Sequence, residues 1–214
     1  MIVGVMGRKN AGKDTAATPL LRYAYTQVNF ADPVREMLLA IDPLIICELF
    51  SLAPVRLSLL VARRGWLYAK NQSQEVRELL QRTGTEGGRM ILGERVWVDE
   101  WERRVGQLAP GAGVIATDVR FPNEAAMIRE RGGIIIRIDN PRLVDNDNHD
   151  SEQVMATIHP DAVVVNDRDV CDLQAEFVHV VGELQRERGQ RWMPGLSGAE
   201  LLRLRGDLPA GRVA

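Results

Sequence analysis

The sequence of 214 residues predicts an α/β fold in three layers, with a five-stranded parallel sheet between two layers of helices. Short apolar runs alternate with stretches of helical periodicity, which is the pattern of consecutive strand–helix–strand units. Most of these runs are almost continuously apolar, as expected for strands that are covered on both faces. The predicted strands are Ile2–Met6, Val28–Ala31, Gly113–Asp118, Gly133–Ile138 and Ala162–Val165.

A long block between the second and third strands, from about residue 32 to 110, has no predicted strand, and we interpret it as a helical insertion. Asp32-Pro33 is typical of a helix start, with Asp32 as the N-cap and Pro33 at the first helical position. A later helix in this block is recognised by its apolar stripe, and Asn71 or Ser73 precedes it as a candidate cap.

The remaining helices follow the same reasoning. Pro19 is expected to kink or delay the first helix, because proline has no backbone N–H donor. Asn123 is a candidate cap for a helix that ends at Arg131, and residues 171–188 have the pattern of a long amphipathic helix. We expect residues 1–189 to form the main domain and residues 190–214 to form a C-terminal tail.

The composition is that of an ordinary globular enzyme, with 45% hydrophobic residues, 26% charged residues and a net charge of -2. This balance produces no field that would attract a nucleic-acid polymer or an anionic membrane. The two cysteines, Cys47 and Cys171, lie far apart, which excludes a disulfide framework or a thiolate zinc site. The N-terminus lacks the pattern of a signal peptide and no segment is apolar enough to span a bilayer, so we expect a cytoplasmic protein.

A phosphate-binding pattern follows the first predicted strand. The segment G-R-K-N-A-G-K-D-T matches G-x-x-x-x-G-K, with Asp14 at the usual Ser/Thr position. Its glycines allow backbone N–H groups to face the β- and γ-phosphates of a nucleotide, and Lys13 can span their oxygens. Thr15 can contact the α-phosphate, and Asp14 is placed to help hold Mg²⁺. The predicted ATP-binding residues are Gly7, Arg8, Lys9, Asn10, Ala11, Gly12, Lys13, Asp14 and Thr15.

The distribution of lysine supports this interpretation. Lysine occurs only at Lys9, Lys13 and Lys70, and arginine supplies the other basic positions. Two of these lysines fall inside the loop, where a compact ammonium on a thin stem cannot be replaced by a planar guanidinium. The alternative, a glycine turn between a strand and a helix, leaves this coincidence unexplained.

Two further charged residues follow the third predicted strand, in the sequence T-D-V-R-F-P. Asp118 and Arg120 should lie at the carboxyl end of the sheet, where parallel α/β proteins bind ligands. We predict that Asp118 orients Mg²⁺ or its waters and that Arg120 points at the transferring phosphoryl group. The alternative is a turn-capping Asp beside a surface Arg, but the phosphate loop favours the functional interpretation. The predicted catalytic residues are Lys13, Asp14, Asp118 and Arg120, with Asp14 and Asp118 as metal ligands.

The helical insertion contains a second polar cluster. Arg77 and Gln81 are i,i+4 neighbours on the face opposite the apolar stripe, and a glycine-rich stretch leads from them to Arg89. Arginine can bind a monophosphate bidentately, and glutamine can read a base edge. Spacing alone nevertheless favours a solvated helix face that the glycines terminate. Trp97 and Trp101 are also four residues apart; Trp101 is expected in the core, and for Trp97 both the core and stacking on a base stay open.

Together these segments resemble the phage-type deoxynucleoside monophosphate kinases, over a range from about Met1 to Asp167. The GTE-GGR and DVRFPNE stretches are more specific to that family than the phosphate loop. The matching segments are the loop from Gly7 to Thr15, F30-A-D-P33, the stretch from Arg77 to Arg89 with Trp97 after it, D118-V-R-F-P-N-E124, Gly132-Gly133 and H149-D-S-E152.

The resemblance implies a P-loop NTPase fold of the adenylate-kinase type, in which the insertion closes over the acceptor and residues 141–152 form a short lid. The implied reaction transfers the γ-phosphate of ATP, with Mg²⁺, to a deoxynucleoside monophosphate, giving ADP and a diphosphate. Lys13, Asp14, Thr15, Asp118 and Arg120 are implied as the phosphate and metal machinery. The implied acceptor contacts are Asp32, Arg77, Gln81, Thr85, Arg89, Trp97 and Arg120.

The predicted lid departs from the wider adenylate-kinase pattern, because it holds one arginine, Arg142, where such lids supply several. Charge stabilisation must then come from Arg120, Arg89 or Arg137. Two other functions stay open: a P-loop kinase of another phosphorylated metabolite, such as phosphomevalonate, and a nucleotide-binding NTPase switch. The base preference, the deoxyribose preference and the oligomeric state, a homo-oligomer included, are not determined by the sequence.

Overall fold

The computed structural model describes residues 1–22, 25–46, 53–143 and 154–189. The chain divides into two compact units, one of Met1–Asn29 with Arg104–Ala214 and the other of Phe30–Arg103. The predicted tail, most of the predicted lid and the H149-D-S-E152 motif lie outside the described residues. Among the residues that are described, no helix is long and apolar enough to cross a membrane.

The first unit contains a five-stranded sheet in the order β2-β5-β1-β6-β7, and every neighbouring pair is parallel. This confirms the predicted α/β class. β1 is the central strand, and its five residues are all buried, as expected for a strand covered on both faces. The strands are β1 (Ile2–Met6), β2 (Tyr25–Gln27), β5 (Gly113–Ala116), β6 (Ile134–Asp139) and β7 (Ala162–Val165).

The second strand lies three residues earlier than predicted. β2 is Tyr25–Gln27, and the predicted run Val28–Ala31 follows it. Val28 N still donates to Ile115 O at 3.0 Å, but the Asn29 side chain then accepts a hydrogen bond from Thr117 N at 2.9 Å. A side chain thus takes the place of the backbone ladder, which ends the strand despite the apolar residues around it.

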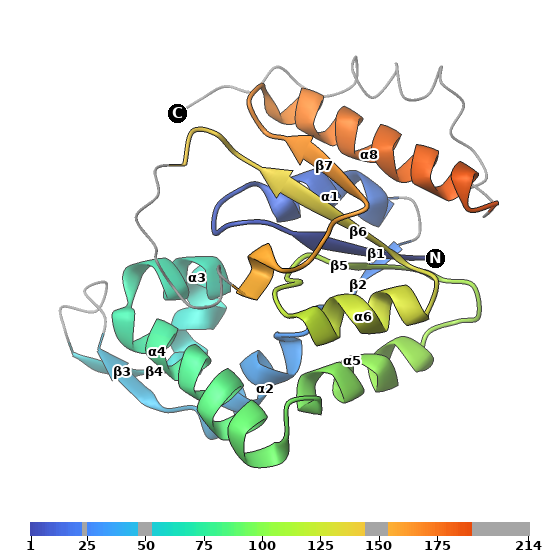
Figure 1. Cartoon of the computed structure of the whole chain (residues 1–214). Coiled ribbons are helices and arrows are strands. Elements are labelled where there is room, and N and C mark those ends of the chain that lie inside the picture. The colour runs from blue at the N-terminus through green and yellow to red at the C-terminus, as the bar shows by residue number, and fades with distance from the viewer. Residues whose placement is uncertain (23–24, 47–52, 144–153, 190–214) are drawn as a thin grey trace. The chain divides into compact units, whose positions relative to one another are not determined.

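Helices cover both faces of this sheet, which completes the three layers (Figure 1). α1 (Lys13–Arg22) and α8 (Val170–Glu187) pack together on one face, and their apolar residues share a core with β1, β6 and β7. α6 (Pro122–Glu130) covers the other face, against β1 and β6. The α6 cap differs from the prediction: the N-cap is Phe121, and Asn123 lies inside the helix.

α1 continues through Pro19 without ending. A proline at this position leaves the carbonyl of Thr15 without its usual i+4 N–H donor. The side chain of Gln174, on α8, fills this role, because its Nε2 donates to Thr15 O at 3.0 Å. The expected break in the first helix is therefore compensated from the neighbouring helix.

We expect Gln174→Leu to lower the free energy of unfolding by about 1 kcal/mol, because it removes this hydrogen bond. In a Pro19→Ala background the loss should be smaller, since the new N–H of residue 19 can bond to Thr15 O within the helix. Urea denaturation of the four proteins measures the difference. An equal loss in both backgrounds would show that Gln174 does not compensate for the proline.

The second unit is mainly helical, but it also contains a short antiparallel hairpin that the sequence did not predict. Each strand has three residues, and in β3 the exposed Leu44 and Ile46 are as apolar as the buried Ile45 between them, so the sequence shows no alternation of apolar and polar residues. The elements are α2 (Asp32–Ile41), β3 (Leu44–Ile46), β4 (Pro54–Arg56), α3 (Leu57–Gln72), α4 (Gln74–Arg82), the π-helix η2 (Thr83–Met90) and α5 (Val96–Gly106), which begins in this unit.

Two predicted caps in this unit have different outcomes. Ser73 is the N-cap of α4, because its hydroxyl accepts from Val76 N at 3.3 Å, whereas Asn71 lies inside α3. Asp32 is the first residue of α2 and not its N-cap, which is Ala31. The Asp32 carboxylate instead pairs with Arg35 one turn later, at 3.0 Å.

Candidate active site

The phosphate loop joins the central strand β1 to the start of α1. Gly7 has a φ of 146°, and a Cβ at this position would lie 2.4 Å from Ile138 O of the neighbouring strand, so only glycine fits. α1 directly follows the loop, and the N–H groups in the first turn of a helix favour an anion at its N-terminus. Lys13 begins this helix, and its ammonium donates to the carbonyl oxygens of Gly7 and Arg8, both at 2.7 Å. The Lys13 side chain thus bridges back to the first two residues of the loop.

A residue that the sequence analysis missed supports the loop from the side. Asn166 directly follows β7, and its Nδ2 donates to Ala11 O at 2.9 Å. A Cβ on Gly12 would lie 2.6 Å from that same nitrogen, so the contact is tight. The sequence could have pointed to Asn166 through its position at the carboxyl end of a predicted parallel strand, where ligand crevices form.

The segment after β5 runs beside the chain that leads into the loop. The pairing of β5 with β1 aligns Ala116 with Gly4, and Val119 N donates to Val5 O at 3.3 Å. In this segment the side chain of Asp118 is half-buried and that of Arg120 is exposed. The structure therefore brings Asp118 and Arg120 to the carboxyl end of β5, next to the end of β1.

A buried carboxylate holds the backbone of this segment. Glu124 is 2% exposed, and its Oε2 accepts from the backbone N–H groups of Arg120, at 2.8 Å, and Phe121, at 3.1 Å. A charged acceptor that receives two N–H groups forms strong hydrogen bonds. The position of the Arg120 backbone thus depends on Glu124, while the Arg120 side chain is left to solvent and ligands.

Asp14 and Thr117 connect the phosphate loop to the end of β5. Thr117 Oγ1 lies 2.5 Å from Asp14 Oδ1, and Gln27 Nε2 donates to the same hydroxyl at 2.9 Å. Thr117 is 3% exposed, so the contact is made at the edge of the protein interior. No motif or spacing in the sequence pointed to Thr117 or Gln27.

The acidic residues of this region suit Mg²⁺ bound together with a nucleotide. Mg²⁺ is usually held by one or two carboxylates, with phosphate oxygens and waters as its other ligands. Asp14, at the start of α1, and Asp118, after β5, supply carboxylates of this kind from neighbouring elements. Within the described part of the chain, no group of three or more His, Cys, Asp or Glu residues forms an all-protein metal site.

The second polar cluster forms a row along one continuous helix. Arg77, Gln81, Thr85 and Arg89 follow one another at intervals of four residues through α4 and η2. Four residues make slightly more than one full turn of an α-helix, so each member of the row is rotated slightly beyond the one before it. Four residues make slightly less than one full turn of the wider π-helix, so there the rotation stops slightly short. The two deviations oppose each other, which keeps the row on one side of the helix.

The glycine-rich stretch therefore does not end the helix, as its composition had suggested. Thr83–Met90 continues α4 as a π-helix. This form is rare in proteins, and where it occurs it is frequently found at functional sites. Backbone carbonyls hold both arginines of the row: Arg77 donates to Lys70 O at 3.1 Å and Arg89 to Glu94 O at 3.2 Å. The first of these bonds uses one of the five N–H donors of the Arg77 guanidinium.

Trp97 lies behind this helix instead of presenting an open face for stacking on a base. Its side chain is 4% exposed, and its indole N–H donates to Gly84 O at 2.7 Å. The ring covers Gly88 so closely that a Cβ there would lie 2.2 Å from Cζ2. Trp101 is fully buried and stacks on Phe30, with ring centroids 4.9 Å apart, which confirms its predicted place in the core.

We expect Gly88→Ala to lower the free energy of unfolding by about 1–3 kcal/mol, because the new methyl group displaces a rigid, buried ring. The displacement should also shift η2 and raise the KM of the acceptor more than that of ATP. Gly87→Ala is the matched control, since its Cβ would meet only Arg82 O at an ordinary 3.6 Å. Equal stability and equal acceptor KM in the two variants would contradict this role of Trp97.

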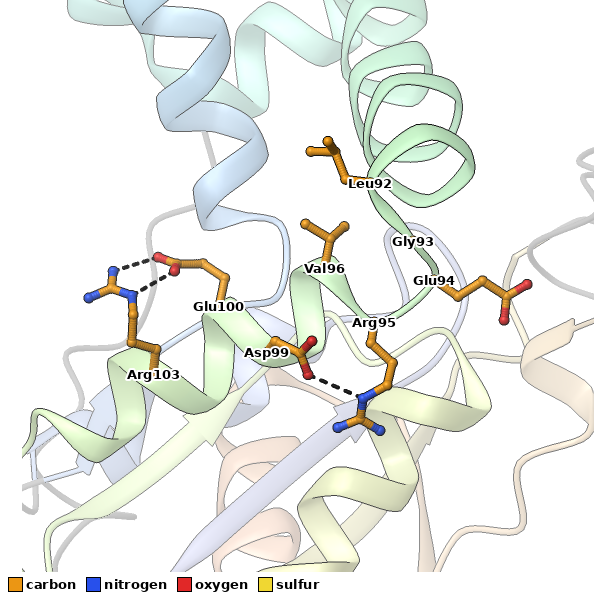
Figure 2. Close-up of a pocket in the computed structure, with 8 residues that line it drawn as sticks. All are labelled: Leu92, Gly93, Glu94, Arg95, Val96, Asp99, Glu100 and Arg103. Atoms are coloured by element: carbon orange, nitrogen blue, oxygen red, sulfur yellow. Dashed lines mark hydrogen bonds and ion pairs between the residues drawn. The ribbon is translucent and has the colours of Figure 1, made fainter.

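A surface cavity of about 640 Å³ also lies in the second unit, at the start of α5. Figure 2 shows two ion pairs among its charged residues: Arg95 with Asp99 at 3.2 Å and Arg103 with Glu100 at 2.7 Å. None of the predicted substrate contacts lines it.

A phosphate loop between the central strand of a parallel sheet and a helix defines the class of P-loop nucleotide-binding proteins. The helical unit adds the row of Arg77, Gln81, Thr85 and Arg89 along α4 and η2. The model of one family, Deoxynucleotide monophosphate kinase, matches residues 61–177, which is more than half of the chain. The chain belongs to this family.

Two relatives found by sequence have descriptions that match the family's. The chain is 29% identical over 204 residues to the Putative deoxynucleotide monophosphate kinase of Acanthamoeba polyphaga mimivirus, covering 85% of this chain and 96% of the relative. It is 46% identical over 54 residues to the Deoxynucleoside-5'-monophosphate kinase of Escherichia phage T5, covering 25% of this chain and 21% of the relative. Among solved structures, shikimate kinase from Aquifex aeolicus VF5 overlaps 88% of this chain and 99% of its own, with 14% identity and a TM-score of 0.43.

Proposed function

We propose that this protein transfers the γ-phosphate of ATP to a deoxynucleoside monophosphate, forming ADP and a deoxynucleoside diphosphate. The observation that carries the proposal is the family match across residues 61–177, which contains both the α4–η2 row and the segment from Asp118 to Glu124. The match begins after the phosphate loop, so the donor side rests on the geometry of Gly7–Thr15 itself. The cytoplasm, that of a host if the protein is viral, supplies both substrates, and we propose it as the compartment.

On the donor side, the loop N–H groups and Lys13 bind the β- and γ-phosphates of ATP. Lys13 exchanges its two carbonyl partners, Gly7 O and Arg8 O, for phosphate oxygens, because a charged acceptor forms the stronger hydrogen bond. Asp14 and Asp118 are the residues that would hold Mg²⁺ with the nucleotide. The ion, when bound, neutralises phosphate charge and orients the transferring group.

On the acceptor side, Arg77 and Arg89 bind the monophosphate, and Gln81 and Thr85 contact the rest of the nucleotide. Asp32, one residue into α2, is proposed as a further contact through its carboxylate, which Arg35 already orients at 3.0 Å. Trp97 supports this surface from behind, through its bond to Gly84 O at 2.7 Å. Direct stacking of Trp97 on the base is not part of the proposal, because its ring is buried.

The reaction needs positioning and charge stabilisation more than proton transfer. An oxygen of the acceptor monophosphate attacks the γ-phosphorus while the bond to the β–γ bridging oxygen breaks, and ADP leaves with that electron pair. The attacking phosphate is ionised at neutral pH, so no general base is required. Arg120, whose side chain is exposed beside the end of β5, is proposed to stabilise the charge on the transferring group.

The test is acceptor-dependent release of ADP. We expect the purified protein to convert ATP to ADP only when a deoxynucleoside monophosphate is added, and the four bases should be compared with their ribonucleotides. Phosphomevalonate tests for a kinase of another metabolite, and ATP alone tests for an NTPase switch. Release that depends on phosphomevalonate, or that needs no acceptor, would replace the proposed function by one of these two.

A further inference from the structure

We propose that Thr117 is a positioning residue for the Asp14 carboxylate, and that it sets the affinity of the ATP-bound site for Mg²⁺. The inference rests on the proposed function, because it needs Asp14 to act toward Mg²⁺ with ATP. It begins from a contact between two residues that lie 103 positions apart in the chain: Thr117 Oγ1 is 2.5 Å from Asp14 Oδ1.

The direction of the hydrogen bonds at Thr117 follows from the donors that are present. A threonine hydroxyl has one proton to donate and two lone pairs to accept with. Gln27 Nε2 donates to this oxygen at 2.9 Å. The proton can go to Asp14 Oδ1, at 2.5 Å, or to Asn29 Oδ1, at 3.3 Å. The nearer acceptor is a carboxylate, so the proton points to Asp14, and the chain runs from Gln27 through Thr117 to Asp14.

The backbone around Thr117 makes this series of hydrogen bonds rigid. Thr117 N donates to Asn29 Oδ1 at 2.9 Å, and Thr117 and Asn29 are 3% and 6% exposed. Thr117 directly follows β5 and Asn29 comes two residues after β2, and these two strands are paired with Gln27 in register with Ile115. The hydroxyl that meets Asp14 is therefore fixed by the sheet and not by a mobile surface rotamer.

Asp14 itself is held loosely by comparison. It lies in the exposed first turn of α1, and within the described part of the chain its side chain has one hydrogen bond, through Oδ1 to Thr117. An exposed aspartate would otherwise sample several rotamers. A donor on Oδ1 restricts the carboxylate to one orientation and leaves Oδ2 as the oxygen that can face an ion. Partners of metal ligands commonly act in this way, and their loss typically lowers metal affinity by about 10–100-fold.

The experiment measures ATP binding by calorimetry, with Mg²⁺ and with EDTA, for the full chain and its variants. The wild type should bind ATP more tightly with Mg²⁺. Thr117→Val keeps the side-chain shape but removes the donor, and we expect it to weaken Mg²⁺ binding in the ATP complex by about 10–100-fold. Binding of metal-free ATP should stay within about threefold, since Lys13 and the loop are intact. Thr117→Ser restores the donor and should restore the Mg²⁺ effect.

A double-mutant comparison separates positioning from a general loss of structure. In an Asp14→Asn background, Thr117→Val should have no further effect on the ratio of ATP affinities with and without Mg²⁺. If Thr117→Val does not fold, as judged by circular dichroism, Gln27→Met takes its place. That variant loosens the hydroxyl while keeping it, so a smaller loss in the same ratio is expected.

The inference is overturned if Thr117→Val keeps the wild-type Mg²⁺ effect, or if it weakens ATP binding equally with Mg²⁺ and with EDTA. The same holds if Thr117→Ser behaves as Thr117→Val does. These results differ from a failure of the proposed function. If the proposed function fails, the wild type itself shows no gain in ATP affinity with Mg²⁺ and no acceptor-dependent release of ADP.

Discussion

Replacing Lys13 with alanine should reduce kcat by about 10²–10³-fold or more, because it removes a preorganised positive charge from the transferring phosphate. The fold should survive. The ammonium donates to two carbonyl oxygens of its own loop, Gly7 O and Arg8 O, so these bonds join the loop to itself and not to distant elements. Steady-state kinetics with saturating ATP and acceptor measures the effect, and thermal unfolding checks the structure.

Lys70→Ala is the matched control for this variant. It removes the one lysine outside the phosphate loop, from the last turn of α3, where no nucleotide contact is proposed. We expect Lys70→Ala to keep kcat within about twofold of the wild type. If Lys13→Ala kept similar activity, the loop could not be the site of phosphoryl transfer.

Replacing Arg120 with alanine is expected to have the second largest effect, a fall in kcat of about 10²–10³-fold with little change in ATP affinity. Of the three arginines considered for charge stabilisation, we propose Arg120. Arg137 is paired with Asp139 at 2.9 Å, and Arg89 belongs to the α4–η2 row, where it donates to Glu94 O at 3.2 Å. The Arg120 side chain is exposed, while its backbone N–H stays bonded to Glu124 at 2.8 Å.

The controls for Arg120 test charge and geometry separately. Arg120→Lys keeps a positive charge but not the planar fork, so it should recover part of the lost activity. Arg186→Ala, an exposed arginine on α8 that belongs to neither side of the proposed site, should leave kcat unchanged. Activity of Arg120→Ala near the wild-type level would transfer the role to Arg89 or Arg137, and the same measurement on those two residues would then decide between them.

Much of the fold could be predicted because it depends on short-range patterns. β1 and β7 have the predicted bounds, since a run of apolar residues between turn signals is enough to specify a parallel strand. β2 was misplaced and the β3–β4 hairpin was missed, because strands of three residues are too short for their periodicity to be read. The glycine-rich stretch was interpreted as a helix end, yet the close packing of Trp97 on Gly88 shows why small residues are needed inside a continuing helix.

The phosphate loop, the residues D118-V-R-F-P-N-E124 and the Arg77–Arg89 stretch were recognised in the sequence itself, the loop by its local spacing and the other two through the family resemblance. The partners of these motifs were decided only by the tertiary structure. Thr117 meets Asp14 across 103 positions, Asn166 meets Ala11 across 155, and Gln174 meets Thr15 across 159. No periodicity or spacing can reveal such pairs, since they exist only after parallel strands have brought their carboxyl ends together at one edge of the sheet.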